Sequence, residues 1–439
     1  MHIRPYPENP FYWEYDHKPT LLIGGSIEDN LFQIDDLEAH LNLLASVGGN
    51  YVRCTMSSRD EGDAWCFLPN ADGTYDLTQP NPAYWEKFEN LLTLAKQHHI
   101  IVQIEVWDRF DFAREPWQDN PFNPKNNGAY TAEESGLVEV IENHPGKRDN
   151  AFFRSVPALE NNTVVLPYQH LFVDWLLEIT LKYPNVLYCM DNETNESPEW
   201  GRYWATYIQH KSEIAGHPVF MTEMWDAWDL NDSQHNATIN HPELYGFIDV
   251  SQNNHNVGLI HWDNLQAVRQ RVKASGQLRP LNMVKIYGAN SGRYGTNRDA
   301  QERFWRAVFG GVASARFHRP PAGLGLSDIT QAHLHSMRMF TNEMQLTTCE
   351  PHLDLIEGRS VNEAYCIANI GVEYGVFFPD GGDIQLQLGA DTPVQVRWLN
   401  IHESTWQPIA DAQRDGNILN LKTPTEDGYW AVLVQHTIL

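Results

Sequence analysis

Short hydrophobic runs alternate with longer amphipathic stretches over the first three quarters of the chain. Each run is rich in β-branched side chains and is followed by a polar loop, after which apolar positions recur every three or four residues. The first pattern is typical of a buried strand and the second of a helix with one buried face. The expected strands are Thr20–Gly24, Tyr51–Thr55, Ile100–Val106, Val186–Met190, Val219–Thr222, Phe247–Val250, Leu281–Ile286 and Ser314–Phe317.

The stretches between these runs predict helices. Their ranges are Asp36–Ser46, Trp85–Gln97, Tyr168–Lys182, Trp200–Ala215, Asn264–Ser275, Asp299–Phe309 and Ile329–Met344. Eight strands that alternate with helices in this way are what a (β/α)8 barrel requires. We therefore predict an α/β fold in which residues 1–348 form a TIM barrel.

One connection in the predicted barrel is much longer than the others. Residues 107–166 separate the third strand from its helix and are rich in Asn, Pro and aromatic side chains. Connections of this kind usually have about two to six residues. We expect this loop to stand at the top of the barrel as a wall beside the substrate.

The pattern changes after the last predicted helix, at a boundary near Thr348–Leu353. Short alternating segments follow, separated by Gly and Asp turns: EAYCIANI, YGVFFP, DIQLQL, VQVRWLNI, ILNLKT and GYWAVLVQ. Alternating segments at this spacing are typical of an antiparallel β-sandwich. Residues 349–439 are therefore predicted to be a small C-terminal sandwich that serves as an accessory domain.

The charge balance of the chain excludes some classes of partner. The 439 residues contain 31 Lys and Arg against 57 Asp and Glu, a formal net charge of −26. Such an excess of negative charge opposes binding to nucleic acid and to anionic membranes. The five cysteines are scattered without metal-ligand spacing, and the glycine-rich runs lack a nucleotide-binding context, so we expect no metal and no cofactor.

The start of the chain bears on where the protein resides. The segment MHIRPYPENPFYWEYD lacks the apolar run of a secretory signal, and no stretch approaches the length of apolar sequence that spans a membrane. The expectation is a cytoplasmic protein, or a periplasmic or secreted one if a leader has been removed. The sequence does not determine the oligomeric state.

The predicted strand ends carry the chemistry. Catalytic and binding groups of (β/α)8 enzymes follow the C-terminal ends of the strands. Here those positions hold amides, carboxylates, bases and indoles, a mixture that binds sugars through aromatic faces and forked hydrogen bonds. The candidate substrate-binding residues are Asn192, Arg53, Trp107, Asp108, Trp225, His255, Lys285, Tyr287, Arg316 and His318. They predict a carbohydrate substrate.

The most specific signal is the run NVLYCMDNETNE, in which the fourth strand ends in Asn192 and Glu193. It resembles the fourth strand of the large clan of retaining (β/α)8 glycoside hydrolases. More narrowly, most of the chain resembles bacterial apiosidase-like and cellulase-like glycosidases that end in a β-sandwich named for collagen binding, whose pattern is similar to EAYCIANIGVEYGVFFPDGG and GYWAVLV. The resemblance implies that Glu193 is the general acid/base and that Asn192 binds the substrate's 2-hydroxyl. A structural role for Glu193 is also open, because acidic residues are favourable near the start of a helix.

The chain departs from this clan at the seventh strand. The clan places its nucleophile, a Glu, near the end of that strand, whereas the run RPLNMVKIYG has Lys285 there. We expect Glu223, at the end of the fifth strand, to point across the barrel mouth as the second catalytic carboxylate. The other candidates are Asp226, Asp108 and Asp249. If no carboxylate faces Glu193, the alternative is a carbohydrate-binding pseudoenzyme that does not cleave.

Basic residues also gather at the predicted strand ends. They are Arg53, Arg109, Lys285, Arg293, Arg316, His318 and Arg319. A positive cluster inside an acidic protein suits a uronic or sulfated sugar, because Arg binds carboxylate and sulfate groups with two parallel hydrogen bonds. The same residues could instead neutralise nearby carboxylates. A third reading makes Lys285 the Schiff-base residue of a barrel aldolase or lyase.

Overall fold

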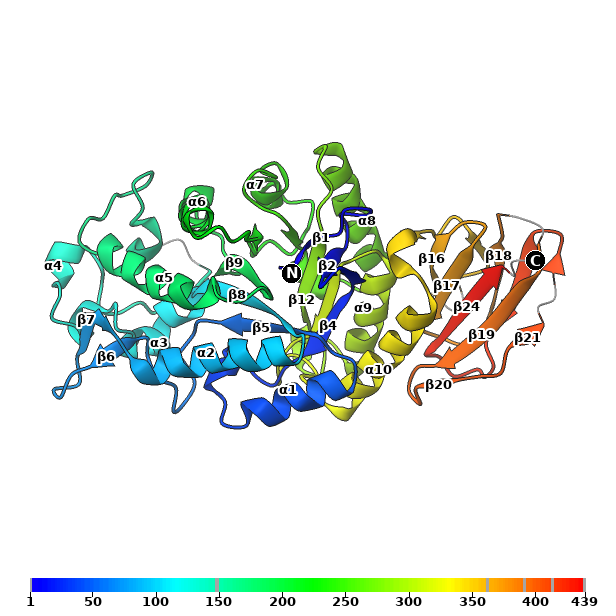
Figure 1. Cartoon of the computed structure of the whole chain (residues 1–439), viewed down its shortest axis with the longest axis horizontal. Coiled ribbons are helices and arrows are strands. Elements are labelled where there is room, and N and C mark those ends of the chain that lie inside the picture. The colour runs from blue at the N-terminus through cyan, green and yellow to red at the C-terminus, as the bar shows by residue number, and fades with distance from the viewer. Residues whose placement is uncertain (1, 147–149, 361–362, 390–391, 412–413, 437–439) are drawn as a thin grey trace.

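The computed structural model describes residues 2–146, 150–360, 363–389, 392–411 and 414–436. In this part of the chain, eight parallel strands surround a common axis and helices lie outside them (Figure 1). The strands are β4 (Leu22–Gly25), β5 (Tyr51–Thr55), β8 (Ile101–Asp108), β9 (Val186–Asn192), β10 (Met221–Thr222), β11 (Ile248–Asp249), β12 (Leu281–Ile286) and β13 (Ser314–Phe317). Each overlaps one of the predicted runs.

The strands form two parallel arcs that close on each other. Their orders are β10-β9-β8-β5 and β11-β12-β13-β4. The Asn50 amide donates to the Ile23 carbonyl at 2.9 Å, and the Phe247 amide donates to the Met221 carbonyl at 3.4 Å, so a backbone bond joins the arcs at each seam. The predicted (β/α)8 barrel is confirmed.

The predicted helices are also present. They are α1 (Leu37–Ser46), α2 (Pro82–Gln97), α5 (Leu166–Thr180), α6 (Pro198–Ala215), α8 (Gly258–Ala274), α9 (Asn297–Phe309) and α10 (Asp328–Glu343). Local signals begin several of them: Asn81 caps α2 ahead of Pro82, and Thr296 and Asp299 form a reciprocal capping box on α9. Between β10 and β11 the chain forms a 3-10 turn at Ser233–His235 and the single α-helical turn α7 (Asn236–Ile239).

An N-terminal sheet that the pattern does not predict closes the opposite end of the barrel from the strand ends that carry chemistry. Its strands are β1 (Arg4–Pro5), β2 (Trp13–Tyr15) and β3 (Lys18–Thr20). Trp13 is fully buried, packs edge-on against Phe247 and donates its indole N–H to Asn282 at 2.9 Å. These strands are too short to show a clear alternation.

The long third connection is packed rather than open. It contains α3 (Arg114–Asp119), α4 (Ala132–Ser135) and several short turns, and a hairpin of β6 (Phe67–Pro69) and β7 (Tyr75–Pro80) lies beside it (Figure 1). Phe112 and Phe152 stack with ring centroids 4.1 Å apart. Asn120 and Asn123 donate to backbone carbonyls within the loop. This bonding explains why the segment is rich in Asn and aromatic residues.

The C-terminal segment forms the predicted β-sandwich. One sheet contains β14 (Glu350–Pro351), β16 (Tyr365–Asn369), β17 (Glu373–Phe378), β24 (Trp430–His436), β19 (Val394–Asn400), β20 (Thr405–Trp406) and β21 (Ala410–Asp411). The other contains β15 (Ile356–Glu357), β18 (Asp383–Gln387), β23 (Ile418–Lys422) and β22 (Arg414–Asp415). Buried hydrophobic side chains fill the space between them.

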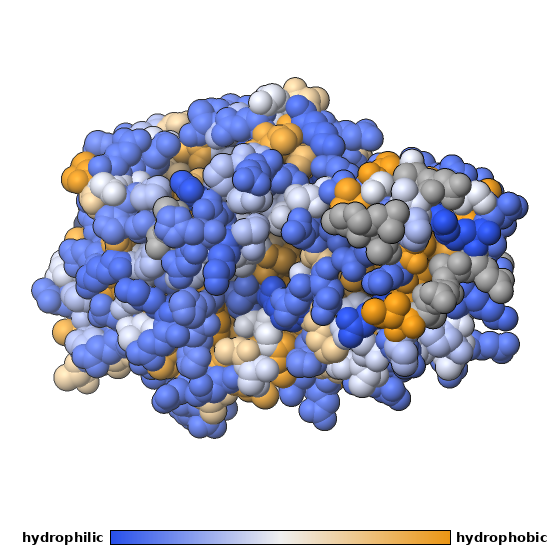
Figure 2. All heavy atoms as spheres, turned by 45° about the vertical axis from the view of Figure 1, so that its right-hand side comes forward, coloured by the Kyte–Doolittle hydropathy of each residue, from blue (hydrophilic) through white to orange (hydrophobic). Residues whose placement is uncertain are grey.

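The larger sheet packs on α9 and α10, which places the sandwich beside the barrel (Figure 1). On β17, Val376 and Phe378 face the sandwich core, whereas Phe377 stacks on Trp305 of α9 with centroids 5.6 Å apart. The strand is therefore buried on both faces, which explains why the run YGVFFP lacks polar positions. Outside this interface, the surface shown in Figure 2 is mostly hydrophilic, with scattered hydrophobic residues.

Candidate active site

A cavity of about 510 Å³ opens at the C-terminal ends of the barrel strands. The loops that follow β4, β5, β8, β9, β10, β11, β12 and β13 all contribute to its wall. The polar and aromatic lining residues are Asp29, Arg59, Phe110, His144, Asn192, Glu193, Asp226, Trp228, Gln252, His255, Lys285, Tyr287, Arg293, Tyr294, His318 and Arg319. This is the location expected for the active site of a TIM barrel.

A buried ion-pair network forms the floor beneath the cavity. Arg53 contacts Glu105 through two hydrogen bonds of 2.5 Å and Asp29 through an ion pair of 2.5 Å. Arg316 donates to the Val284 carbonyl at 2.8 Å. Neither arginine lines the cavity, so the prediction that Arg53 and Arg316 bind substrate is wrong. Both are fully buried and instead neutralise carboxylates inside the barrel.

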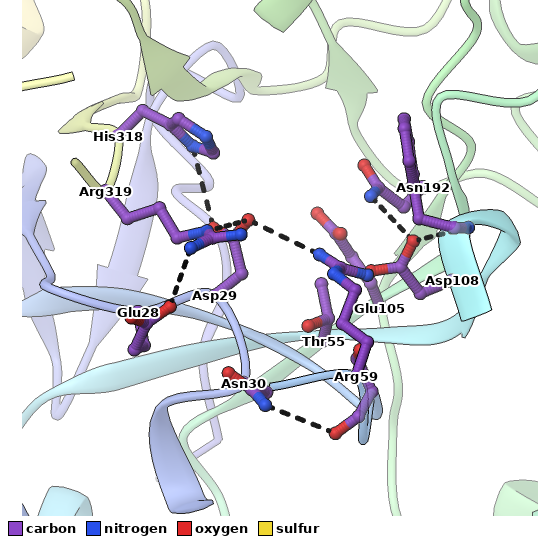
Figure 3. A network of polar contacts seen from close by, with 12 residues as sticks. Glu28, Asp29, Asn30, Thr55, Arg59, Glu105, Asp108, Asn192, His318 and Arg319 are labelled. Atoms are coloured by element: carbon purple, nitrogen blue, oxygen red, sulfur yellow. Dashed lines mark hydrogen bonds and ion pairs between the residues drawn. The ribbon is translucent and has the colours of Figure 1, made fainter. Parts of the chain in front are cut away.

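Asp29 connects this floor to the cavity wall. Figure 3 shows His318 and Arg319 directed at Asp29 from one side, and Arg319 also pairs with Glu28 at 3.0 Å. Burial opposes the charge of Asp29, but Arg53 and the other cations around it together outweigh burial and hold the pKa of Asp29 well below its usual range. Burial lowers the pKa of His318, so this predicted ligand presents a neutral ring to the cavity.

Asp108 positions Asn192 and does not itself line the cavity, contrary to its predicted contact with substrate. The Asn192 amide donates to Asp108 Oδ1 at 3.0 Å, and Arg59 pairs with the other oxygen of Asp108 (Figure 3). This pairing fixes the orientation of the Asn192 side chain at the cavity wall. Asn192 therefore lines the cavity with its amide already oriented, and its contact with substrate stays a prediction.

Glu193 and Lys285 form an ion pair inside the cavity. The Lys285 ammonium donates to Glu193 Oε1 at 2.5 Å and to Asn192 Oδ1 at 2.6 Å, and the Tyr287 hydroxyl donates to Glu193 Oε1 at 3.1 Å. Burial opposes the charge of Glu193, but the charge and hydrogen bond of Lys285, with Arg53 and the Tyr287 hydroxyl, outweigh burial and lower the pKa of Glu193. Glu193 is a carboxylate at neutral pH, and both contacts of Lys285 favour a point charge over a Schiff-base nucleophile.

An irregularity in β12 places Lys285 at the barrel mouth. The pairing register of β12 with β13 shifts between Met283 and Ile286. Both of these side chains lie in the core between the barrel and the helices. In a regular strand, residues three apart point to opposite faces, so the strand is irregular between them. A bulge of this kind re-aims one side chain, and here it directs Lys285 toward Glu193.

Asp226 stands beside Glu193 on the neighbouring strand extension. The Asp226 amide donates to the Thr194 carbonyl and the Thr194 amide donates to the Met224 carbonyl, both at 2.8 Å, which continues the pairing of β9 and β10 into the loops. In the described part of the chain, no group donates a hydrogen bond to the Asp226 carboxylate. Burial and then the charge of Glu193 raise the pKa of Asp226 to about 6.

Glu223 does not point across the barrel mouth, and that prediction is wrong. Its Oε1 accepts the Asp191 amide at 2.9 Å, and a Cβ built on Gly201 of α6 would lie 2.0 Å from its Oε2. The side chain therefore turns toward α6 and does not line the cavity. Burial, followed by the charge of Asp191, raises its pKa well above the usual range, so Glu223 is a buried neutral acid.

The predicted aromatic contacts are also placed differently. Trp107 packs among the aromatic side chains of the long loop and α6, including Trp204, with ring centroids 5.2 Å apart. Trp225 is buried and donates to the Thr238 hydroxyl at 2.7 Å. Neither lines the cavity. Trp228 lines it instead, half exposed and stacked on His255 with centroids 3.9 Å apart.

The structure thus brings half of the predicted site residues to the cavity. Those that line it are Asn192, Glu193, His255, Lys285, Tyr287 and His318. Those that do not are Arg53, Trp107, Asp108, Trp225, Arg316 and Glu223. The prediction used distance from a strand end, which does not show whether a side chain points inward, outward or along the barrel axis. Asp226 and Trp228 follow β10, which has only two residues. So short a strand gives no pattern from which the direction of these side chains could be predicted.

Three general properties of the described ranges complete the site. Within them, no group of three or more His, Cys, Asp or Glu side chains is arranged to hold a metal ion. No helix there is long and apolar enough to cross a membrane. All five cysteines are buried and unbridged.

Searches with the sequence gave no match to a protein-family model or to a curated protein. Solved structures do match. A glycoside hydrolase family 5 structure from Bacteroides vulgatus ATCC 8482 is 13% identical, with a TM-score of 0.67 over 99% of this chain and 93% of that one. An endo-1,4-beta-mannanase from Rhizomucor miehei is 13% identical, with a TM-score of 0.52 over 78% of this chain and 100% of that one.

A family 30 endoxylanase from Clostridium papyrosolvens C71 is 9% identical, with a TM-score of 0.50 over the whole of both chains. At these identities the likeness concerns the fold. It confirms at that level the resemblance to (β/α)8 glycoside hydrolases that Asn192 and Glu193 indicate in the sequence.

Proposed function

We propose that this protein is a glycoside hydrolase that cleaves O-glycosidic bonds in a carbohydrate. One observation supports this most directly: Glu193 and Asp226 line the same cavity in opposite electrostatic environments. Glycosidic cleavage uses two carboxyl groups, one protonated and one ionised, beside the scissile bond. Groups whose surroundings push their pKa values apart are suited to those two roles.

The rest of the cavity suits a sugar. The exposed face of Trp228 offers a stacking surface for C–H groups, and Asn192 and Gln252 offer amides to hydroxyls. The solved structures of similar fold are a family 5 glycoside hydrolase, an endo-1,4-beta-mannanase and a family 30 endoxylanase. The fold agrees with the proposal, and the cavity residues supply its chemical basis.

A second groove supports an oligosaccharide or polysaccharide as substrate. Its volume is about 590 Å³, and it shares Arg59 with the main cavity. Trp65 and Tyr75, both partly exposed, lie along it. Aromatic faces next to a site of cleavage suit further sugar units, so a chain would extend past Arg59 into this groove.

We further propose that the substrate is an acidic sugar. Four cationic side chains line the main cavity, and three of them already pair with carboxylates: Lys285, Arg59 and Arg319. The fourth, Arg293, is exposed at the rim, and no carboxylate of the described residues lies within ion-pair distance of it. Its guanidinium is available to a carboxylate or sulfate on the substrate.

Arg293→Gln should weaken binding of an anionic substrate and leave that of a neutral one unchanged. We expect KM for a uronic or sulfated oligosaccharide to rise about tenfold, because one charge-assisted contact is lost. The kcat should change less than KM, since Arg293 forms no ion pair or hydrogen bond with Glu193 or Asp226 among the described residues. Steady-state kinetics at low and high salt measure this, and equal effects on neutral and anionic substrates would argue against an acidic sugar.

The function itself is tested by activity on a panel of neutral, uronic and sulfated glycans, with reducing ends and oligosaccharide products followed. We expect wild type to cleave at least one member and Glu193→Gln to lose activity by about a hundredfold or more. The matched control is Glu199→Gln, the same substitution at the start of α6 and outside the cavity. It should behave like wild type.

A carbohydrate-binding protein without activity is the second candidate. The observation in its favour is that Lys285 occupies the seventh strand and neutralises Glu193. This candidate predicts that wild type binds a member of the panel without releasing reducing ends. Calorimetric binding by wild type, weakened in Trp228→Ala and unaccompanied by products, would establish it and contradict the hydrolase.

A further inference from the structure

We propose that Asp226 is the proton donor of the reaction and that Glu193 acts as a carboxylate throughout, the reverse of the role that the clan resemblance implies for Glu193. This inference rests on the proposed hydrolase function. It follows from which carboxyl groups reach the cavity and from what each of them touches.

Glu193 is held as an anion. Its Oε1 accepts hydrogen bonds from the Lys285 ammonium at 2.5 Å and from the Tyr287 hydroxyl at 3.1 Å. A protonated Glu193 would have to give up the contact with a buried cation, and Lys285 is only 2% exposed. Among the described residues no donor occupies Oε2, which remains free to face a substrate.

Asp226 has the opposite surroundings. No described residue donates to its carboxylate and none pairs with it, while its backbone is fixed against Thr194 by a 2.8 Å hydrogen bond. Partial burial and then the neighbouring charge of Glu193 favour the protonated form, with a pKa of about 6. A protonated carboxyl without an internal partner can donate its hydrogen to a ligand.

The other acidic side chains near the site are paired with arginines or point away from the cavity. Of the described residues that line the cavity, the carboxylates are Asp29, Glu193 and Asp226. Asp29 is paired with Arg53 at 2.5 Å and with Arg319 at 3.2 Å. Glu223 turns toward α6 and outside the lining. Asp226 is thus the acid that can reach a scissile bond next to Glu193.

The bond between the anomeric carbon and the glycosidic oxygen breaks, its electron pair goes to that oxygen, and the oxygen takes the proton of Asp226. The Glu193 carboxylate stabilises the positive charge that develops on the anomeric carbon. Water then supplies the new oxygen on that carbon, and its released proton restores the protonation of the pair. Lys285 stays charged and keeps Glu193 ionised.

Leaving-group dependence separates the two roles. Asp226→Asn should lose about a hundredfold in kcat/KM on the oligosaccharide cleaved by wild type, because a sugar alkoxide cannot leave unprotonated. On the 2,4-dinitrophenyl glycoside of the same sugar the loss should stay below about tenfold, because dinitrophenolate leaves without a proton. Glu193→Gln should lose activity on both substrates. Asp229→Asn, an exposed residue of the same loop, is the control.

The pH profile gives a second measurement. In wild type the rate on the oligosaccharide should fall above a pH of about 6, as Asp226 loses its proton. With the dinitrophenyl glycoside, Asp226→Asn should lack this alkaline limb and keep the acidic limb that belongs to Glu193. A structural role for Asp226 would lower the rate on both substrates equally and leave the profile unchanged, which would overturn the proposal.

The same variants separate a reversal of the two roles from the absence of hydrolase activity. If Glu193→Gln retains activity on the dinitrophenyl glycoside and Asp226→Asn does not, the roles are reversed and the hydrolase function stands. If wild type cleaves nothing, the hydrolase function fails, and difference infrared spectra still test the assignment of protons. Wild type should then show a protonated carboxyl at pH 5 that is absent in Asp226→Asn, and its presence in Asp226→Asn but not in Glu193→Gln would overturn the proposal.

Discussion

Lys285→Met should lower kcat/KM by about a thousandfold at neutral pH, because one preorganised charge at the reacting pair is removed. Lys285 is the largest influence that lowers the pKa of Glu193 against burial. Without it, burial raises that pKa, so the ionised fraction of Glu193 falls and the acidic limb of the pH profile moves to higher pH. Asn192 also loses its 2.6 Å contact with the ammonium. Kinetics from pH 4 to 9 measure both effects.

Tyr287→Phe is the matched control for this experiment. It removes the other donor to Glu193 Oε1, at 3.1 Å, without removing a charge. We expect a loss of only about tenfold and little movement of the acidic limb, since a neutral hydrogen bond contributes roughly 1 kcal/mol. A Lys285→Met enzyme with the activity and profile of wild type would show that Glu193 needs no counter-ion.

Arg53→Met should lower the free energy of unfolding by about 3–5 kcal/mol, the cost of leaving a buried charge without its partner. Arg53 is fully buried and holds both Glu105 and Asp29 at 2.5 Å. Methionine fills a similar volume, so the loss reports the charges rather than a cavity. Urea unfolding followed by tryptophan fluorescence measures the change in the midpoint.

The double variant Arg53→Met/Glu105→Gln is the control for Arg53→Met. It removes one of the two carboxylates that Arg53 neutralises, so part of the lost stability should return. The coupling energy from the four proteins then isolates the ion pair. If Arg53→Met alone is as stable as wild type, Arg316 and Arg319 neutralise Asp29 sufficiently without Arg53.

The strands of the barrel were predictable because their burial leaves a direct trace in the sequence. Tyr51–Thr55, Leu281–Ile286 and Ser314–Phe317 begin and end where the hydrophobic runs do. The N-terminal sheet was missed because its strands have two or three residues, too few to show a period. The single turn α7 was missed for the same reason.

The site was predictable in part. Asn192 and Glu193 were found because they end a long, clearly hydrophobic strand, and Lys285 because it stands where an acid was expected. Trp107 was misplaced because it lies within β8 with its side chain in an aromatic cluster, and Glu223 because it follows β10 but turns toward α6. Side-chain direction beyond a strand end depends on loop conformation, which has no periodicity to detect.

By itself, the sequence determined the order of strands and helices, the closed barrel they require and the change to a sandwich near residue 348, because burial of hydrophobic side chains imposes local periods. It also located Glu193, and it showed that the seventh strand carries Lys285 where an acid was expected. Only the tertiary structure decided which charges meet: the bulge in β12 that brings Lys285 to Glu193, and the pairing beyond β9 and β10 that sets Asp226 beside it. Charge interactions depend on distances between residues remote in the chain, and folding alone sets those distances.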